Sequence, residues 1–128
     1  ENMQEKDALL LAYKGALEAI LTKTTWNVFK KMSYLRQSNS TLDKAISLDP
    51  RNVEVRFLRM AVQCQIPSYL GYSENIEEDR RYILHHIEDF NFQELDPKIQ
   101  YEIMKFFINC DKFNKQEIFQ LKESTATR

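Results

Sequence analysis

Two adjacent histidines, His85 and His86, are the residues in this chain whose type is best suited to acid–base or metal chemistry. Neighbouring residues on a helix point about 100° apart, so the two imidazoles cannot converge on one metal ion. His85 and Asp89 are four residues apart and share a helix face, which gives two potential ligands. Protein zinc sites take three or four protein ligands, and the sequence offers no evident third. The pattern therefore predicts a partly exposed histidine pair near a helix end.

Signals for catalysis or for cofactor binding are weak elsewhere in the sequence. Gly15 and Gly71 are the only glycines, so a glycine-rich phosphate loop is excluded. Cys64 and Cys110 have no histidine close in sequence that would complete a nucleophile motif. Both lie among apolar residues, which predicts two buried thiols, with a disulfide as the alternative in an exported protein. We predict no catalytic residue, cofactor or metal, and we keep an enzyme with a site between helical hairpins as a minor alternative.

Arginine and tyrosine side chains form the candidate binding surface. Arg56 and Arg59 are three residues apart and share a helix face, where a planar guanidinium group can clamp a carboxylate. Tyr69 and Tyr72 follow in the stretch PSYLGY, which turns the chain after this helix. We predict that these four residues contact a protein or peptide partner. The alternatives are solvated ion pairs for the arginines, and corner packing for the tyrosines with Leu70 directed inward.

The composition indicates that helices position these side chains. The chain has 128 residues, 43% of them hydrophobic, and contains two glycines and three prolines. A chain of this length can form one packed domain. So few turn-forming residues favour long helices over a β-fold. The prediction is a single all-α domain that covers residues 1–128.

Charge and hydropathy narrow the classes of partner. The net charge is −1 and the pI is near 6.2, which gives no basic footprint for nucleic acid. No stretch approaches the roughly 18 to 20 apolar residues of a membrane span, so we expect no membrane insertion. The chain begins with Glu1, and both an exported, periplasmic mature form and a cytoplasmic protein remain open.

The first predicted helix, at about residues 3–22, has a wide apolar arc. Its stripe follows a period of 3.6 residues and consists of Leu10, Tyr13, Leu17, Ile20 and Leu21. Leucine and alanine residues widen this stripe, and a helix with so wide an apolar arc is expected to be covered on more than one side. The same arc motivates an alternative function, which is self-association as a homodimer through this helix.

Apolar periodicity and capping signals predict about five further helices. The second covers about 27–47 and has a polar stretch at 37–41 that could bend or break it. The third follows Asp49–Pro50, with Asn52 as a rival cap, and ends by Ile66 because Pro67 follows. The others begin near Asn75, Asp96 and Asn114, with capping-box spacing to Glu78 from the first and to Glu117 from the last. The tail at 122–128 is expected to fray.

The predicted helices pair into hairpins that recur along the chain. Asp-Pro followed by a basic residue occurs at 49–51 and again at 96–98, each time before an apolar helix. The chain therefore divides into three antiparallel hairpins. Helix pairs that recur every roughly 35 to 47 residues are typical of a right-handed α-solenoid.

The stretch LDKAISLDPRNVEVRF at 42–57 resembles the junction between two tetratricopeptide repeats. Ala45 occupies the small-residue position five residues before Pro50, and Asn52 begins the next helix. AYKGA at 12–16 is similar to the small-residue face of a repeat's first helix. DPRNVEVRFLR followed by PSYLGY also resembles a small set of uncharacterised bacterial proteins, whose members often carry export signals.

The resemblance implies a tetratricopeptide-like fold that binds peptides or protein segments on a concave face. A fold does not fix a function by itself. The expectation from the sequence is a non-enzymatic protein–protein interaction module or scaffold, with the homodimer as the leading alternative.

Overall fold

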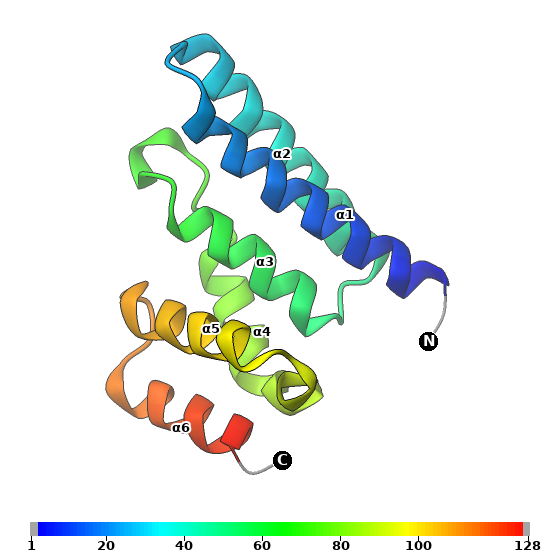
Figure 1. The fold of residues 1–128 in the computed structure, drawn as a ribbon, viewed down its shortest axis with the longest axis vertical. Coiled ribbons are helices and arrows are strands. Elements are labelled where there is room, and N and C mark those ends of the chain that lie inside the picture. The colour runs from blue at the N-terminus through cyan, green and yellow to red at the C-terminus, as the bar shows by residue number, and fades with distance from the viewer. Residues whose placement is uncertain (1–2, 127–128) are drawn as a thin grey trace.

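The computed structural model describes residues 3–126, and within that range it contains six α-helices and no strand (Figure 1). The predicted all-α class is therefore confirmed. The helices are α1 (Met3–Ile20), α2 (Val28–Leu48), α3 (Val53–Cys64), α4 (Ile76–His86), α5 (Pro97–Asn109) and α6 (Lys115–Ala126). Short 3₁₀ turns join them, namely η1 (Leu21–Thr24), η2 (Ser68–Leu70), η3 (Ile87–Asp89) and η4 (Phe92–Glu94).

Helix α3 occupies the middle of the molecule. Figure 1 shows α1 and α2 side by side at one end and α6 at the other. Both α1 and α2 contact α3, which in turn packs on α4. The core has two clusters on either side of α3. The N-terminal cluster is built from Ala8, Ala12, Leu42, Ala45, Ile46 and Val55. The larger C-terminal cluster includes Val53, Phe57, Met60, Ile83, Phe107 and Leu121.

Helices α1 and α2 approach closely because small residues face the contact. Ala8, Ala12 and Gly15 are buried on α1, and a Cβ at Gly15 would lie 2.7 Å from Cγ of Leu42. The Ser38 hydroxyl donates a hydrogen bond of 2.7 Å to the Gly15 carbonyl oxygen. Ser38 therefore belongs to the helix contact, and α2 continues unbroken through the polar stretch at 37–41.

Three of the predicted helix starts are capped by side chains. The Asn27 side chain accepts a hydrogen bond of 3.1 Å from the Lys30 amide, and Asp96 accepts one of 2.8 Å from the Lys98 amide. Asn114 and Glu117 form the reciprocal capping box, at 2.8 and 3.0 Å. Each cap satisfies backbone amides that have no partner within the helix.

Two predicted starts need correction. Helix α3 begins at Val53 and is capped by the rival residue Asn52, whose side chain accepts a hydrogen bond of 3.2 Å from the Val55 amide. At α4 the predicted capping box is wrong, because the Asn75 side chain makes no cap. Its amide oxygen accepts from Gln63 Nε2 at 3.0 Å, and Gln63 Oε1 accepts from the Asn75 backbone amide at 3.2 Å.

The end of α6 also differs from the prediction. The helix continues to Ala126, although fraying was predicted from residue 122. Thr125 is buried, and its hydroxyl donates a hydrogen bond of 2.8 Å to the Leu121 carbonyl oxygen. The Gln93 side chain of η4 donates a hydrogen bond to the Thr125 carbonyl oxygen, which ties this last turn to another element, and residues 127–128 lie outside the described residues.

Candidate functional site

Helix α3 places Arg56 and Arg59 together, as their spacing predicts. Both side chains are buried, with 7% and 4% of their surface exposed. Two arginines can be buried in this way only when carboxylates and carbonyl oxygens compensate their charge. The interpretation of these two residues as solvated surface pairs is therefore wrong.

Asp79 of α4 is the carboxylate that joins the two arginines. Arg59 donates from Nε and Nη2 to the two Asp79 carboxylate oxygens, with both distances 2.8 Å. Arg56 Nη1 donates to Asp79 Oδ1 at 3.1 Å and to Glu78 Oε2 at 2.6 Å. Asp43 of α2 accepts from Arg59 Nη1 at 3.1 Å. The network thus connects α2, α3 and α4, and an incoming carboxylate would have to displace one of these partners.

Burial and ion pairing have opposite effects on the pKa values of the groups in this network. Burial raises the pKa of the Asp79 carboxyl, and the hydrogen bonds from Arg59 and Arg56 oppose that change. Burial acts to lower the pKa of Arg59, but the hydrogen bonds to Asp79 and Asp43 leave it raised. We take the network as fully ionised, because charge-assisted bonds of 2.8 Å with bidentate geometry fit a carboxylate.

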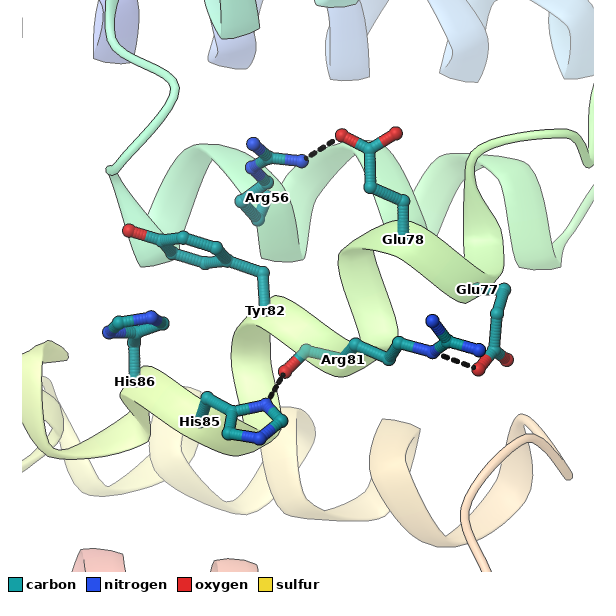
Figure 2. A pocket seen from close by; sticks show the side chains of 7 residues that line it. All are labelled: Arg56, Glu77, Glu78, Arg81, Tyr82, His85 and His86. Carbon is teal, nitrogen blue, oxygen red and sulfur yellow. Dashed lines mark hydrogen bonds and ion pairs between the residues drawn. The ribbon is translucent and has the colours of Figure 1, made fainter.

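A hollow of about 450 Å³ lies beside this network (Figure 2). The Arg56 guanidinium carbon lies 4.8 Å from the centre of the Tyr82 ring, and the His86 ring stacks on Tyr82 at 4.2 Å. His85 Nδ1 lies 2.8 Å from the Arg81 carbonyl oxygen. The seven lining residues are Arg56, Glu77, Glu78, Arg81, Tyr82, His85 and His86.

The carboxylates and guanidinium groups of this hollow are already paired. Glu78 pairs with Arg56, and Glu77 pairs with Arg80 and Arg81. The hydrogen bonds from these last two arginines lower the pKa of Glu77 to about 2. Residues 3–126 contain no group of three or more side chains placed to hold a metal ion.

The four predicted contact residues differ in exposure and in their place along the fold. Tyr69 in η2 has 86% of its surface exposed, so the alternative that it packs into the corner is wrong. Leu70 and Tyr72 are half-buried, and Gly71 adopts the left-handed φ of 85° that turns the chain. This corner follows the C-terminal end of α3, whereas Arg56 lies in its first turn. Of the four residues, Tyr69 has the exposure that a contact residue needs.

The two cysteines are partly buried free thiols rather than a disulfide. They line one hollow of about 520 Å³ between the ends of α3 and α5. The hydrogen bond between their sulfur atoms, with further help from Lys112, lowers the pKa of Cys110 to about 7. The same hydrogen bond raises the pKa of Cys64.

The outward side of α1 carries a row of exposed apolar side chains, which we call the α1 face. It consists of Met3, Leu10, Tyr13, Leu17 and Ile20. Leu10 and Leu17 have 71% and 63% of their surface exposed, although α1 packs against both α2 and α3, which is the covering on more than one side that its wide apolar arc predicts. The Tyr13 hydroxyl donates a hydrogen bond to the Glu54 carboxylate of α3. Burial raises the pKa of Tyr13, and this hydrogen bond raises it further.

Three more exposed apolar side chains follow α1, namely Trp26 in the turn before α2 and Val28 and Phe29 in the first turn of α2. Trp26 has 98% of its surface exposed. Sequence reasoning missed this turn as a functional candidate. The sequence feature that could have indicated it is Trp26, which precedes the helix cap Asn27 and does not belong to the apolar stripe of either flanking helix.

Over residues 3–126, no helix combines the length and the apolar character needed to cross a membrane. Comparison of the chain with protein-family models, with curated proteins and with solved structures found no match.

Proposed function

We propose that the protein is a non-enzymatic interaction module that binds a protein chain through the α1 face. The observation that carries the proposal is the row of large apolar side chains exposed along one side of α1. Fully burying one such side chain contributes about 1.5–3 kcal/mol. Continuous exposed apolar surfaces of this kind mark interaction sites in soluble proteins.

The surrounding geometry supports a rigid recognition surface. On the side that faces α2, helix α1 is held in place by the close contact of Gly15 with Leu42 and by the Ser38 hydrogen bond. Recognition by a preorganised helix loses little conformational entropy on binding. Trp26 and Phe29 are further exposed apolar side chains, which follow α1 in the chain, and tryptophan is among the side chains that contribute most to protein interfaces.

We further propose that the six helices form a tetratricopeptide-like right-handed stack of three antiparallel hairpins. Contacts between α1 and α2, between α3 and α4, and between α5 and α6 support this pairing.

The proposal is tested by affinity capture from the producing cells with the full chain as bait. The variant Leu10→Glu/Leu17→Glu places two charges in the α1 face, and we expect the proteins captured by wild type to be lost. Tyr101→Glu/Phe119→Glu is the matched control, because these two side chains are similarly exposed on α5 and α6. Circular dichroism checks that both variants fold.

Each captured protein is then purified and its direct binding to the three forms is measured. Binding that weakens at least tenfold for the α1 variant and stays unchanged for the control supports the proposal. Capture that is identical for wild type and for the α1 variant overturns it.

A further inference from the structure

The α1 face has the spacing of a coiled-coil seam. Met3, Leu10 and Leu17 are seven residues apart, and Tyr13 and Ile20 repeat the same interval three residues later. This alternation of three and four residues places the side chains on one stripe that another helix can meet. The stripe is exposed along α1, so the missing partner of the seam is a helix with a similar apolar stripe.

Charged residues beside the stripe restrict what that second helix can be. Asp7 and Lys14 are exposed on the same edge of the stripe, seven residues apart. No ion pair within the described residues engages either of them. If a second identical helix runs in the opposite direction, the acid of each helix can lie beside the base of the other.

We propose that the occupant of the α1 face is a second copy of this chain, with the two α1 helices antiparallel. This inference rests on the proposed function, since it names the partner of the same surface. A two-fold axis near the middle of the stripe places Leu10 of each copy opposite Tyr13 of the other, and Met3 opposite Ile20. A two-fold interface of this kind uses the same patch on both copies.

The charges select this register and orientation. In the antiparallel register Asp7 of each copy lies within about 3 Å, along the helix axis, of the level of Lys14 of the other. Two ion pairs then flank the seam, as the edge positions of coiled coils do. Lys6 lies opposite Leu17, where its aliphatic stem covers the leucine while the ammonium group reaches solvent.

Other arrangements of the same two helices bring like charges together. Sliding one copy by seven residues places Lys14 beside Lys14 of the other copy. A parallel pair aligns identical residues across the seam, and Lys6 would then lie beside Lys6. Like charges at such positions are destabilising, so the antiparallel register is the one that the sequence of α1 favours.

Sedimentation equilibrium of the full chain over a concentration series in low salt tests the proposal. We expect wild type to show a monomer–dimer equilibrium. Asp7→Lys and Lys14→Asp each convert two attractive pairs into two repulsive pairs, so each should raise the dissociation constant about tenfold. The double variant Asp7→Lys/Lys14→Asp exchanges the charges, and it should return the constant to within about threefold of wild type.

Glu88→Lys and Lys122→Asp are matched controls, because both residues are exposed and lie away from α1, and they change the net charge by the same amounts. We expect the controls to leave the dissociation constant unchanged. Added salt should reduce the difference between the single variants and wild type, because it screens exposed charges.

A wild-type chain that stays monomeric up to about 1 mM, where association contributes about 4 kcal/mol at most, overturns the proposal. A double variant no better than the single variants also overturns it. A failure of this proposal can be distinguished from a failure of the proposed function. If wild type is monomeric but capture still depends on Leu10 and Leu17, the face binds a different protein. If capture is independent of these leucines as well, both proposals fail.

Discussion

Asp79 is the residue on which the buried charge network depends. Its carboxylate accepts three hydrogen bonds from Arg56 and Arg59, and its side chain is fully buried. Removing one partner from a buried ion pair leaves an uncompensated charge and costs about 3–5 kcal/mol. We expect Asp79→Asn, which keeps the shape of the side chain, to lower the free energy of unfolding by that amount in urea titrations.

Glu102→Gln is the control for this substitution. Glu102 pairs with Lys105 at 3.6 Å on the exposed side of α5, and exposed pairs contribute under about 1 kcal/mol. A loss for Asp79→Asn no larger than that of the control would show that Arg56 and Arg59 are compensated without this carboxylate.

The contact between α1 and α2 depends on a residue without a side chain. Alanine usually stabilises a helix relative to glycine by about 1 kcal/mol. At Gly15 the added Cβ would lie 2.7 Å from Cγ of Leu42, and overpacking of this kind costs about 1–3 kcal/mol. We therefore expect Gly15→Ala to destabilise the protein in thermal and urea unfolding, despite its better helix propensity.

A double-mutant cycle separates the steric cause from any other. In the Leu42→Ala background the clashing atoms are gone, so Gly15→Ala should be neutral or stabilising there. Gly71→Ala serves as a contrast, because Gly71 has open space around it and a φ of 85°. Its cost of about 1–2 kcal/mol comes from the backbone and should not change in the Leu42→Ala background. An equal effect of Gly15→Ala in both backgrounds contradicts the steric account.

Local signals predicted the helices better than the contacts between them. Asn114 with Glu117 and Asn75 with Glu78 have the same spacing, yet only the first pair forms a capping box. Gln63 binds Asn75 and Arg56 binds Glu78, and these partners come from a different helix. A pattern within three residues contains no information about such long-range partners, so the sequence predicts both boxes equally.

In the candidate site too, the local pattern was predictable from the sequence and the contacts between helices were not. Helical periodicity placed Arg56 and Arg59 on one face, but their partner Asp79 depends on which helix packs there. The apolar arc of α1 was visible in the sequence, whereas its exposure was not. Glycine and alanine form the side that meets α2, so the larger side chains remain outside. Which of two apolar stripes is buried is decided by the shape of the neighbouring helix.

At the scale of the whole molecule, α3 is shared by both hydrophobic clusters. Its residue Val55 belongs to the N-terminal cluster, and Phe57 belongs to the C-terminal cluster. Leu58 packs against both. Arg59 adds a polar link, because it binds Asp43 of α2 and Asp79 of α4. One helix that completes two cores should make them unfold together.

We therefore expect cooperative unfolding, measured by native-state hydrogen exchange with mass spectrometry. Leu42→Ala removes a buried side chain from the N-terminal cluster and Phe107→Ala removes one from the C-terminal cluster, at a cost of about 2–5 kcal/mol each. Each variant should reduce the protection of the slowest amides in α2, α3 and α5 alike, because these amides exchange through global unfolding. If Leu42→Ala affects only α1 and α2 while α5 keeps its protection, the hairpin α1–α2 unfolds on its own, and α3 does not couple the two clusters.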